Sequence, residues 1–188
     1  MKDFFLSASV PLPERDSKFY ANSDLLAIRN AVKSLIEIVL PVGTLTFGGH
    51  PAITPLISLY VREMSFKPSQ VTVYQSQFFE KQFPEENERF VNLRVTPAGS
   101  DERKSLRIMR TEMIKSRKFD AAVFIGGMEG IIEEYKLFSK LHPNTPTLPI
   151  ASTGAAARQI FDEGIFEPQW KDDLNYTTLF RRFFRPDL

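Results

Sequence analysis

Short apolar runs alternate with longer amphipathic stretches through most of this chain, and this alternation constrains the fold more than any other feature of the sequence. The apolar runs predict buried strands at residues 3–9, 44–49, 71–76, 91–96, 121–127 and 147–153. The stretches between them predict helices at residues 23–41, 50–64, 100–118, 131–141 and 154–164. Strands that alternate with helices indicate a parallel sheet covered on both faces. We therefore expect one Rossmann-like α/β domain with a mostly parallel, six-stranded sheet.

The first long helix has the clearest periodicity. Its expected inner face consists of Leu25, Ile28, Val32, Leu35 and Val39, which are spaced by three and four residues. Ser23 is the expected N-cap, and Pro41 is expected to stop the helix. Residues 77–90 fit either a loop or an irregular helix. The core is expected to span about residues 3–160, followed by a C-terminal tail at 165–188 that ends in a helix.

Length and charge narrow the class of protein. The chain of 188 residues suits a single domain in residues 1–188. Its net charge of +1 makes nucleic acid an unlikely partner, because little of the surface would neutralise phosphates. No apolar run is long enough to cross a membrane or to act as a signal peptide. The absence of cysteine fits a cytoplasmic protein, and no metal site or cofactor is expected from the spacing of His and acidic residues.

Small and polar residues gather directly after the predicted strands. Because the carboxyl ends of parallel strands meet at one edge of the sheet, these residues are expected to line one ligand site there. Glycines allow backbone amides to approach an anion, and a helix N-terminus offers free N–H donors. The candidate ligand-binding residues are Ser7, Ser9, Arg15, Gly48, Gly49, His50, Gln75, Ser76, Gly126, Gly127, Met128, Glu129, Gly130, Glu133, Thr153 and Gly154. Ser7, Gly48, Gly126 and Thr153 in particular are expected to share one cavity.

Several of these signals have a structural alternative. The glycine pair at 126–127 could be a tight turn only; if it instead lies against a ligand, Gly127→Val should abolish binding while the protein still folds. His50 could cap a helix. Three arginines at 103, 107 and 110 form either a solvated face or a phosphate clamp. The glutamates at 129, 133 and 134 are either surface charges on the first turns of a helix or are directed into a pocket, where burial would raise the pKa of a carboxyl group.

The stretch "FDAAVFIGGMEGIIEEY" resembles the glycine turn of the SLOG superfamily. The LOG-type phosphoribohydrolases of that superfamily carry P-G-G-x-G-T-x-x-E. Placing Gly126 and Gly127 on the glycine pair puts Glu133 on the final glutamate, which is catalytic in those enzymes. Ile125, Glu129 and Gly130 then replace the proline, the third glycine and the threonine of the motif. The segment "SLRIMRTEM" lies where those enzymes have an arginine.

Together with "SASVP", "FGGHPAITPLI" and "YQS", this turn resembles the non-enzymatic SLOG branch associated with bacterial defence. That resemblance implies a sensor of a nucleotide-derived ligand, either an ADP-ribose-like molecule or a cyclic nucleotide. An effector protein and a second copy of the chain are the candidate partners. The alternative is a nucleoside 5′-monophosphate phosphoribohydrolase that uses Glu133. The resemblance spans about residues 3–160.

Overall fold

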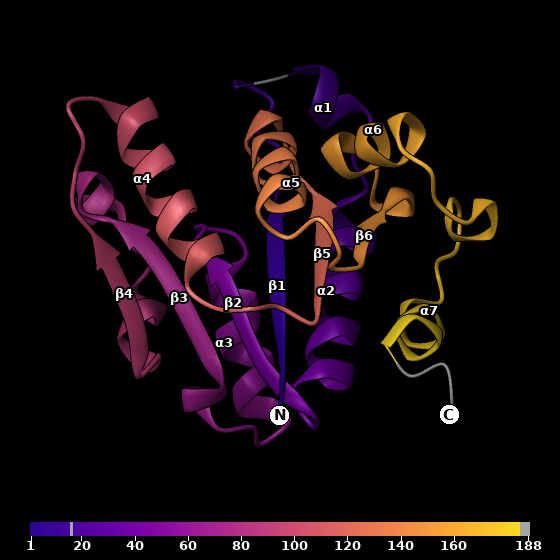
Figure 1. Cartoon of the computed structure of the whole chain (residues 1–188), viewed down its shortest axis with the longest axis horizontal. Helices are drawn as coiled ribbons and strands as arrows, with labels where there is room; N and C mark the ends of the chain where they lie inside the picture. The colour runs from indigo at the N-terminus through magenta and orange to yellow at the C-terminus, as the bar shows by residue number, and fades with distance from the viewer. Residues whose placement is uncertain (16, 185–188) are drawn as a thin grey trace.

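A computed structural model describes residues 1–15 and 17–184, and it confirms the Rossmann-like α/β fold (Figure 1). Its six strands are β1 (Lys2–Ser9), β2 (Gly43–Gly48), β3 (Val71–Ser76), β4 (Asn92–Thr96), β5 (Ala121–Gly126) and β6 (Thr147–Ile150). They form one sheet in the order β4-β3-β2-β1-β5-β6, and every neighbouring pair is parallel. The order reverses direction between β1 and β5, which is where a ligand is expected in such sheets.

Helices cover both faces of the sheet (Figure 1). The α-helices are α1 (Ser17–Ala21), α2 (Leu25–Val39), α3 (Thr54–Glu63), α4 (Glu102–Lys115), α5 (Glu129–Leu141), α6 (Ala155–Glu163) and α7 (Tyr176–Phe184). Five 3-10 helices connect them: η1 (Pro68–Gln70), η2 (Gln77–Gln82), η3 (Glu85–Arg89), η4 (Ala151–Thr153) and η5 (Pro168–Trp170). The segment 77–90, which fitted a loop or an irregular helix, thus contains η2 and η3.

The alternation of side chains along β1 divides the core in two. Phe4, Leu6 and Ala8 face α2, α3 and α7, while Phe5 faces α4, α5 and α6. Helix α7 packs against α2 and contributes Phe180 to the same apolar cluster as Phe4. The expected C-terminal helix therefore closes the core, while residues 185–188 lie outside the described residues.

Several boundaries differ from the sequence-based predictions, and α3 begins at 54, four residues later than expected. Asp24, not Ser23, is the N-cap of α2, because its side chain accepts a hydrogen bond from the Ala27 amide at 2.8 Å. Leu25 then falls on the outer side of the first turn and is 47% exposed. The last strand ends at 150, because the Thr153 hydroxyl turns back to donate to the Ile150 carbonyl at 2.6 Å within η4. Helix α5 begins at 129, two residues earlier than expected.

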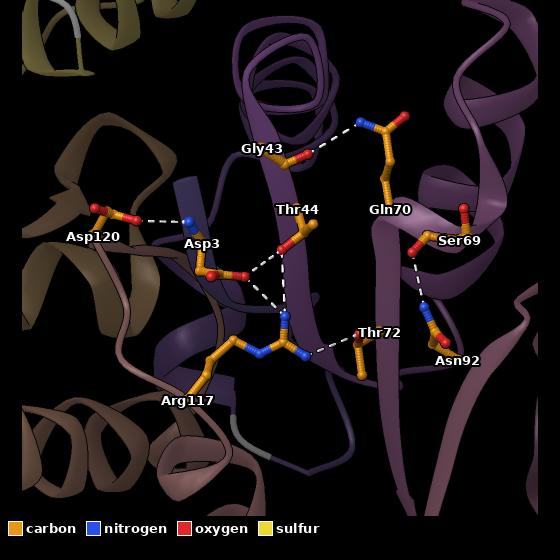
Figure 2. Close-up of polar contacts among 9 residues, drawn as sticks. All are labelled: Asp3, Gly43, Thr44, Ser69, Gln70, Thr72, Asn92, Arg117 and Asp120. Atoms are coloured by element: carbon orange, nitrogen blue, oxygen red, sulfur yellow. Dashed lines mark hydrogen bonds and ion pairs between the residues drawn. The ribbon is translucent and has the colours of Figure 1, made fainter. Parts of the chain in front are cut away.

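A polar network ties together the amino edge of the sheet (Figure 2). The Arg117 guanidinium, just after α4, donates to Asp3 on β1 at 2.8 Å and to Thr44 on β2 at 3.4 Å. It also reaches Thr72 on β3 at 3.5 Å. Burial alone would raise the pKa of Asp3, but hydrogen bonds from Thr44 and Arg117 outweigh it and lower that pKa. One guanidinium therefore joins three neighbouring strands at the edge opposite the candidate site.

Candidate functional site

A cavity of about 670 Å³ lies at the carboxyl ends of β1, β2 and β3, against α4 and α5. Its wall is made by residues Ser7, Ala8, Ser9, Leu12, Arg15, Gly48, Gly49, His50, Pro51, Ala52, Gln75, Phe79, Gln82, Phe83, Pro84, Glu102, Arg103, Leu106, Met109, Arg110, Met128, Glu129, Gly130, Ile131, Glu133 and Glu134. A volume of several hundred Å³ at this place in an open α/β sheet is typical of a small-molecule site.

One end of the cavity is built around a buried ion pair. Ser7 follows Phe5 on the same face of β1, and its hydroxyl donates to Glu134 Oε2 at 2.7 Å. Arg110 on α4 donates from Nε to Glu134 Oε1 at 3.1 Å and from a terminal nitrogen to Glu133. Glu134 is only 8% exposed. We call Ser7, Arg110, Glu133, Glu134 and the adjoining Glu129 and Gly130 the inner end of the cavity.

Gly130 makes room for this ion pair. A Cβ at position 130 would lie 2.6 Å from the outer terminal nitrogen of Arg110, so a side chain there would displace the guanidinium. Glycine at position 130 therefore leaves room for the Arg110 guanidinium. The Arg110 guanidinium of α4 therefore lies at the cavity beside the carboxylates of α5.

The other end of the cavity is more exposed and carries two arginines. Arg15, in the loop after β1, lies 3.5 Å from Glu102 at the start of α4, and both side chains are more than half exposed. His50 follows β2 and lies within the electrostatic reach of Arg15. Burial, and next the positive charge of Arg15, lower the pKa of His50 to about 4. We call Arg15, His50, Glu102 and Arg103 the outer end of the cavity.

His50 is therefore neutral at pH 7, and its tautomer follows from its contacts. Its Nδ1 accepts a hydrogen bond from the Ala52 amide at 3.2 Å, so Nε2 carries the ring proton. The backbone amide of His50 in turn donates to the Thr54 hydroxyl at 3.0 Å. His50 is not the helix cap, because the N-cap of α3 is Ile53; it orders the turn before α3 and also lines the cavity.

Gln75 presents an unpaired carboxamide to the cavity. It is the penultimate residue of β3 and only 5% exposed. Within residues 1–15 and 17–184, its side-chain amide has no hydrogen-bond partner, and the amide atoms are not among the fully buried unpaired ones, so they reach the open space of the cavity. A Cβ on residue 49 would lie 2.1 Å from the Gln75 Nε2 atom. Glycine at position 49 therefore lets the Gln75 side chain lie against the backbone. The Gln75 amide is therefore available to bind a ligand or water in the cavity.

An apolar wall lies between the two ends. Phe79, Phe83 and Pro84 contribute to it from η2 and the residues that follow, and Leu106 and Met109 from α4. Leu106 is half-buried in this wall. Flat apolar surfaces with a few polar groups around them suit a heterocyclic ring.

The structure brings most of the sequence-based candidates together. Those that line the cavity are Ser7, Ser9, Arg15, Gly48, Gly49, His50, Gln75, Met128, Glu129, Gly130 and Glu133. Those that do not line it are Ser76, Gly126, Gly127, Thr153 and Gly154. The expectation of one cavity shared by Ser7, Gly48, Gly126 and Thr153 is therefore met only by the first two.

The five residues outside the cavity have structural contacts. The Ser76 hydroxyl accepts from the Phe78 amide at 3.4 Å, and the Gly126 amide donates to the Thr153 hydroxyl at 2.9 Å. Gly127 has a φ of +82°, and a Cβ there would lie 2.0 Å from Ile131. Gly154 has a φ of +72° and packs against the Asn22 carbonyl. The glycine pair is thus a tight turn packed on protein, and the expectation that Gly127→Val would leave folding intact has no support here.

Two residues that line the cavity were named from the sequence only within groups, as one of three arginines and one of three glutamates. Arg110 belonged to the arginine stripe, but it is mostly buried while Arg107 is exposed. Glu134 lies between Ile131 and Phe138 on the buried face of α5, at spacings of three and four residues. An acidic residue on an apolar helix face is the signal by which Glu134 could have been identified from the sequence.

The part of the chain that the structure describes contains neither a cluster of metal-binding side chains nor a membrane-spanning helix. Among residues 1–15 and 17–184, no three His, Asp or Glu side chains are grouped so that they could hold a metal ion. No helix in these same ranges has both the length and the apolar character needed to cross a bilayer.

Comparisons with known proteins agree with the fold. A model of the SLOG cluster3 family matches residues 18–184. The crystal structure of TM1055, a structural genomics target, is similar to this chain with a TM-score of 0.55 and 16% sequence identity. That match covers 90% of this chain and 88% of the other, and at this identity it shows a shared fold. No curated protein matches the chain significantly.

Proposed function

The chain belongs to the SLOG cluster3 family, whose fold is a nucleotide-binding one, and on this premise we propose that it senses a nucleotide-derived ligand in the cavity between α4 and α5. Bound ligand would be recognised by an effector protein, in keeping with the resemblance to sensors of bacterial defence. The supporting observation is the division of the cavity into an arginine-bearing outer end, an apolar middle and a carboxylate-bearing inner end.

Each part of the cavity suits one part of a nucleotide. Arg15 and Arg103 can neutralise phosphate oxygens, and the neutral His50 can donate from Nε2 without adding charge. The apolar wall can pack against a base. Carboxylates accept hydrogen bonds from sugar hydroxyls, so the inner end suits a ribose.

A titration of purified protein with nucleotides and ADP-ribose derivatives, followed by calorimetry, tests this function. Arg103→Gln removes a guanidinium from the outer end and should weaken binding about tenfold, the loss of one charged hydrogen bond. Arg107→Gln is the matched control, because Arg107 is on the same helix but does not line the cavity. Equal effects of the two substitutions, or no binding by any compound, would contradict the proposal.

Glu133 provides the observation that favours a second candidate, hydrolysis of a nucleoside 5′-monophosphate. Its side chain lines the cavity, pairs with Arg110 and is 47% exposed, so a sugar could reach it. Water would replace the base at C1′, and the carboxylate would stabilise positive charge that develops on the ribose. Chromatography for free base after incubation with nucleotides tests this candidate. Base release that disappears in Glu133→Gln would make the protein a hydrolase instead of a sensor.

A further inference from the structure

We propose that the outer edge of β4 pairs with the same edge of a second copy of this chain. The two strands would run antiparallel, in the register that places Leu93 opposite Leu93 of the second copy, and the two sheets would join into one. Residues 91–96 do not line the cavity. The inference therefore concerns a different surface and does not depend on the proposed function.

The two edges of the sheet differ in how they are protected against pairing. β4 and β6 are the outer strands, and each has a single neighbour (Figure 1). β6 contains Pro149, and a proline in an edge strand removes a backbone donor that a further strand would need. β4 spans Asn92–Thr96 without a proline. Its alternate N–H and C=O groups point away from β3 and remain able to pair.

Apolar side chains alternate along this edge. Val91, directly before β4, is followed by Leu93 and Val95 at every second position, which places the three on one face of an extended chain. Leu93 lies beside Val73 of β3 and packs against the apolar cluster on the α2 and α3 side of the sheet. Val91 is 76% exposed and Val95 is 50% exposed. An exposed apolar stripe beside free backbone groups is a template for another strand.

The order of residues favours a second copy over an unrelated strand. The segment 91–95 reads Val-Asn-Leu-Arg-Val, so its apolar positions are symmetric about Leu93. In an antiparallel pair centred on Leu93, Val91 of each copy lies opposite Val95 of the other. Apolar side chains directly opposite each other stabilise antiparallel strands. The edge is therefore complementary to itself, as a twofold interface requires.

Arg94 selects this register over its neighbours. Its side chain is exposed, and a pair centred on Arg94 would place two like charges opposite each other, which is destabilising. Centred on Leu93, each Arg94 instead lies opposite Asn92 of the other copy. The Asn92 amide nitrogen donates to the Ser69 carbonyl at 2.8 Å (Figure 2). Its side-chain oxygen is left to accept a hydrogen bond from the facing guanidinium.

Sedimentation of the whole chain at concentrations from about 1 μM to about 1 mM measures the association. Two double variants test the register at its two exposed ends. Val91→Lys with Val95→Lys places lysine opposite lysine, whereas Val91→Lys with Val95→Glu places lysine opposite glutamate. Ile165→Lys is the control, because Ile165 is fully exposed and follows α6, which packs on β5 and β6 (Figure 1). Melting temperatures are measured in parallel to show that the variants fold.

Wild type should form a dimer within this range. The variant with two lysines should associate at least about tenfold more weakly, because like charges meet at both ends of the strand pair. The lysine–glutamate variant should associate at least about ten times more tightly than the variant with two lysines, and Ile165→Lys should match wild type.

A wild-type chain that stays monomeric would overturn the inference and leave the edge to an extended segment of another protein. Wild-type association by the variant with two lysines would also overturn it, because the contact would then lie elsewhere. Equal weakening of both double variants would show that the register is wrong. Weakening by Ile165→Lys as large as that of the two lysines would show that added charge alone prevents association.

Discussion

Gly127→Ala should destabilise the protein strongly although the residue does not line the cavity. Gly127 has a φ of +82°, a backbone conformation that costs an L-residue about 1–2 kcal/mol. The added Cβ would also lie 2.0 Å from Ile131 Cγ1 and 2.9 Å from the Ser9 hydroxyl. Overpacking of this kind costs about 1–3 kcal/mol. The two effects together predict a loss of about 2–5 kcal/mol in the free energy of unfolding.

Gly48→Ala is the matched control for this substitution. Gly48 lines the cavity, and a Cβ there would meet only the flexible ends of Met109 and Met113, at 3.6 Å. Because no positive φ is involved, alanine should keep or raise stability by about 0.5–1 kcal/mol. The pair of glycines therefore separates a residue that the fold requires from one that borders the ligand space.

Urea denaturation followed by circular dichroism measures both variants. Gly127→Ala should lower the midpoint at an unchanged slope, while Gly48→Ala should not. A loss of 2–5 kcal/mol is a large share of the roughly 5–15 kcal/mol by which domains are stable. The reasoning is refuted if Gly127→Ala unfolds at the wild-type midpoint and only ligand binding is lost.

Two further substitutions test the electrostatics of the cavity. Arg110→Met should lower the free energy of unfolding by about 3–5 kcal/mol, since it leaves the buried Glu134 without a counterion. The double variant Arg110→Met with Glu134→Leu should recover much of that loss in the same urea assay. If it recovers none, the lost ion pair is not the cause of the destabilisation. His50 has a folded pKa of about 4 against an ordinary 6.5, so the unfolded chain binds a proton between these values that the folded protein does not. Stability should therefore fall as pH drops from 6.5 towards 4, by at most about 3 kcal/mol, and urea melts at several pH values should show a flatter dependence in His50→Gln.

The fold was predictable because its signals are local. Strand and helix alternation is readable in any short window, and five of the six strands lie within two residues of their predicted bounds. The sixth ended early because Thr153 turns its hydroxyl back on the Ile150 carbonyl, a contact that apolarity does not encode. Ser and Asp are both favoured N-caps, so the sequence did not distinguish Ser23 from Asp24. The structure shows that Asp24 is the N-cap, because its side chain accepts the hydrogen bond from the Ala27 amide.

The candidate site was only partly predictable, because it depends on contacts between distant segments. The edge of the sheet follows from parallel pairing, so Ser7 and Gly48 could be placed there. The ion pair joins Arg110 and Glu134, 24 residues apart in the chain, and the packing of α4 beside α5 decides which arginine and which glutamate meet. Gly126 ends β5 just as Gly48 ends β2, yet Gly126 packs against Ile28 of α2, and Gly127 packs against Ile131 of α5.

The buried Ser7–Glu134–Arg110 cluster has a consequence for how the family diverges. Substitutions in this cluster affect folding as well as binding, so drift there is opposed by selection for a stable protein. Arg15 and Glu102 are more than half exposed and can be exchanged at small cost. We therefore expect related sequences to retain the inner end and to vary at the outer end. Under the proposed function, new ligand specificities would then arise mainly by substitutions at the outer end.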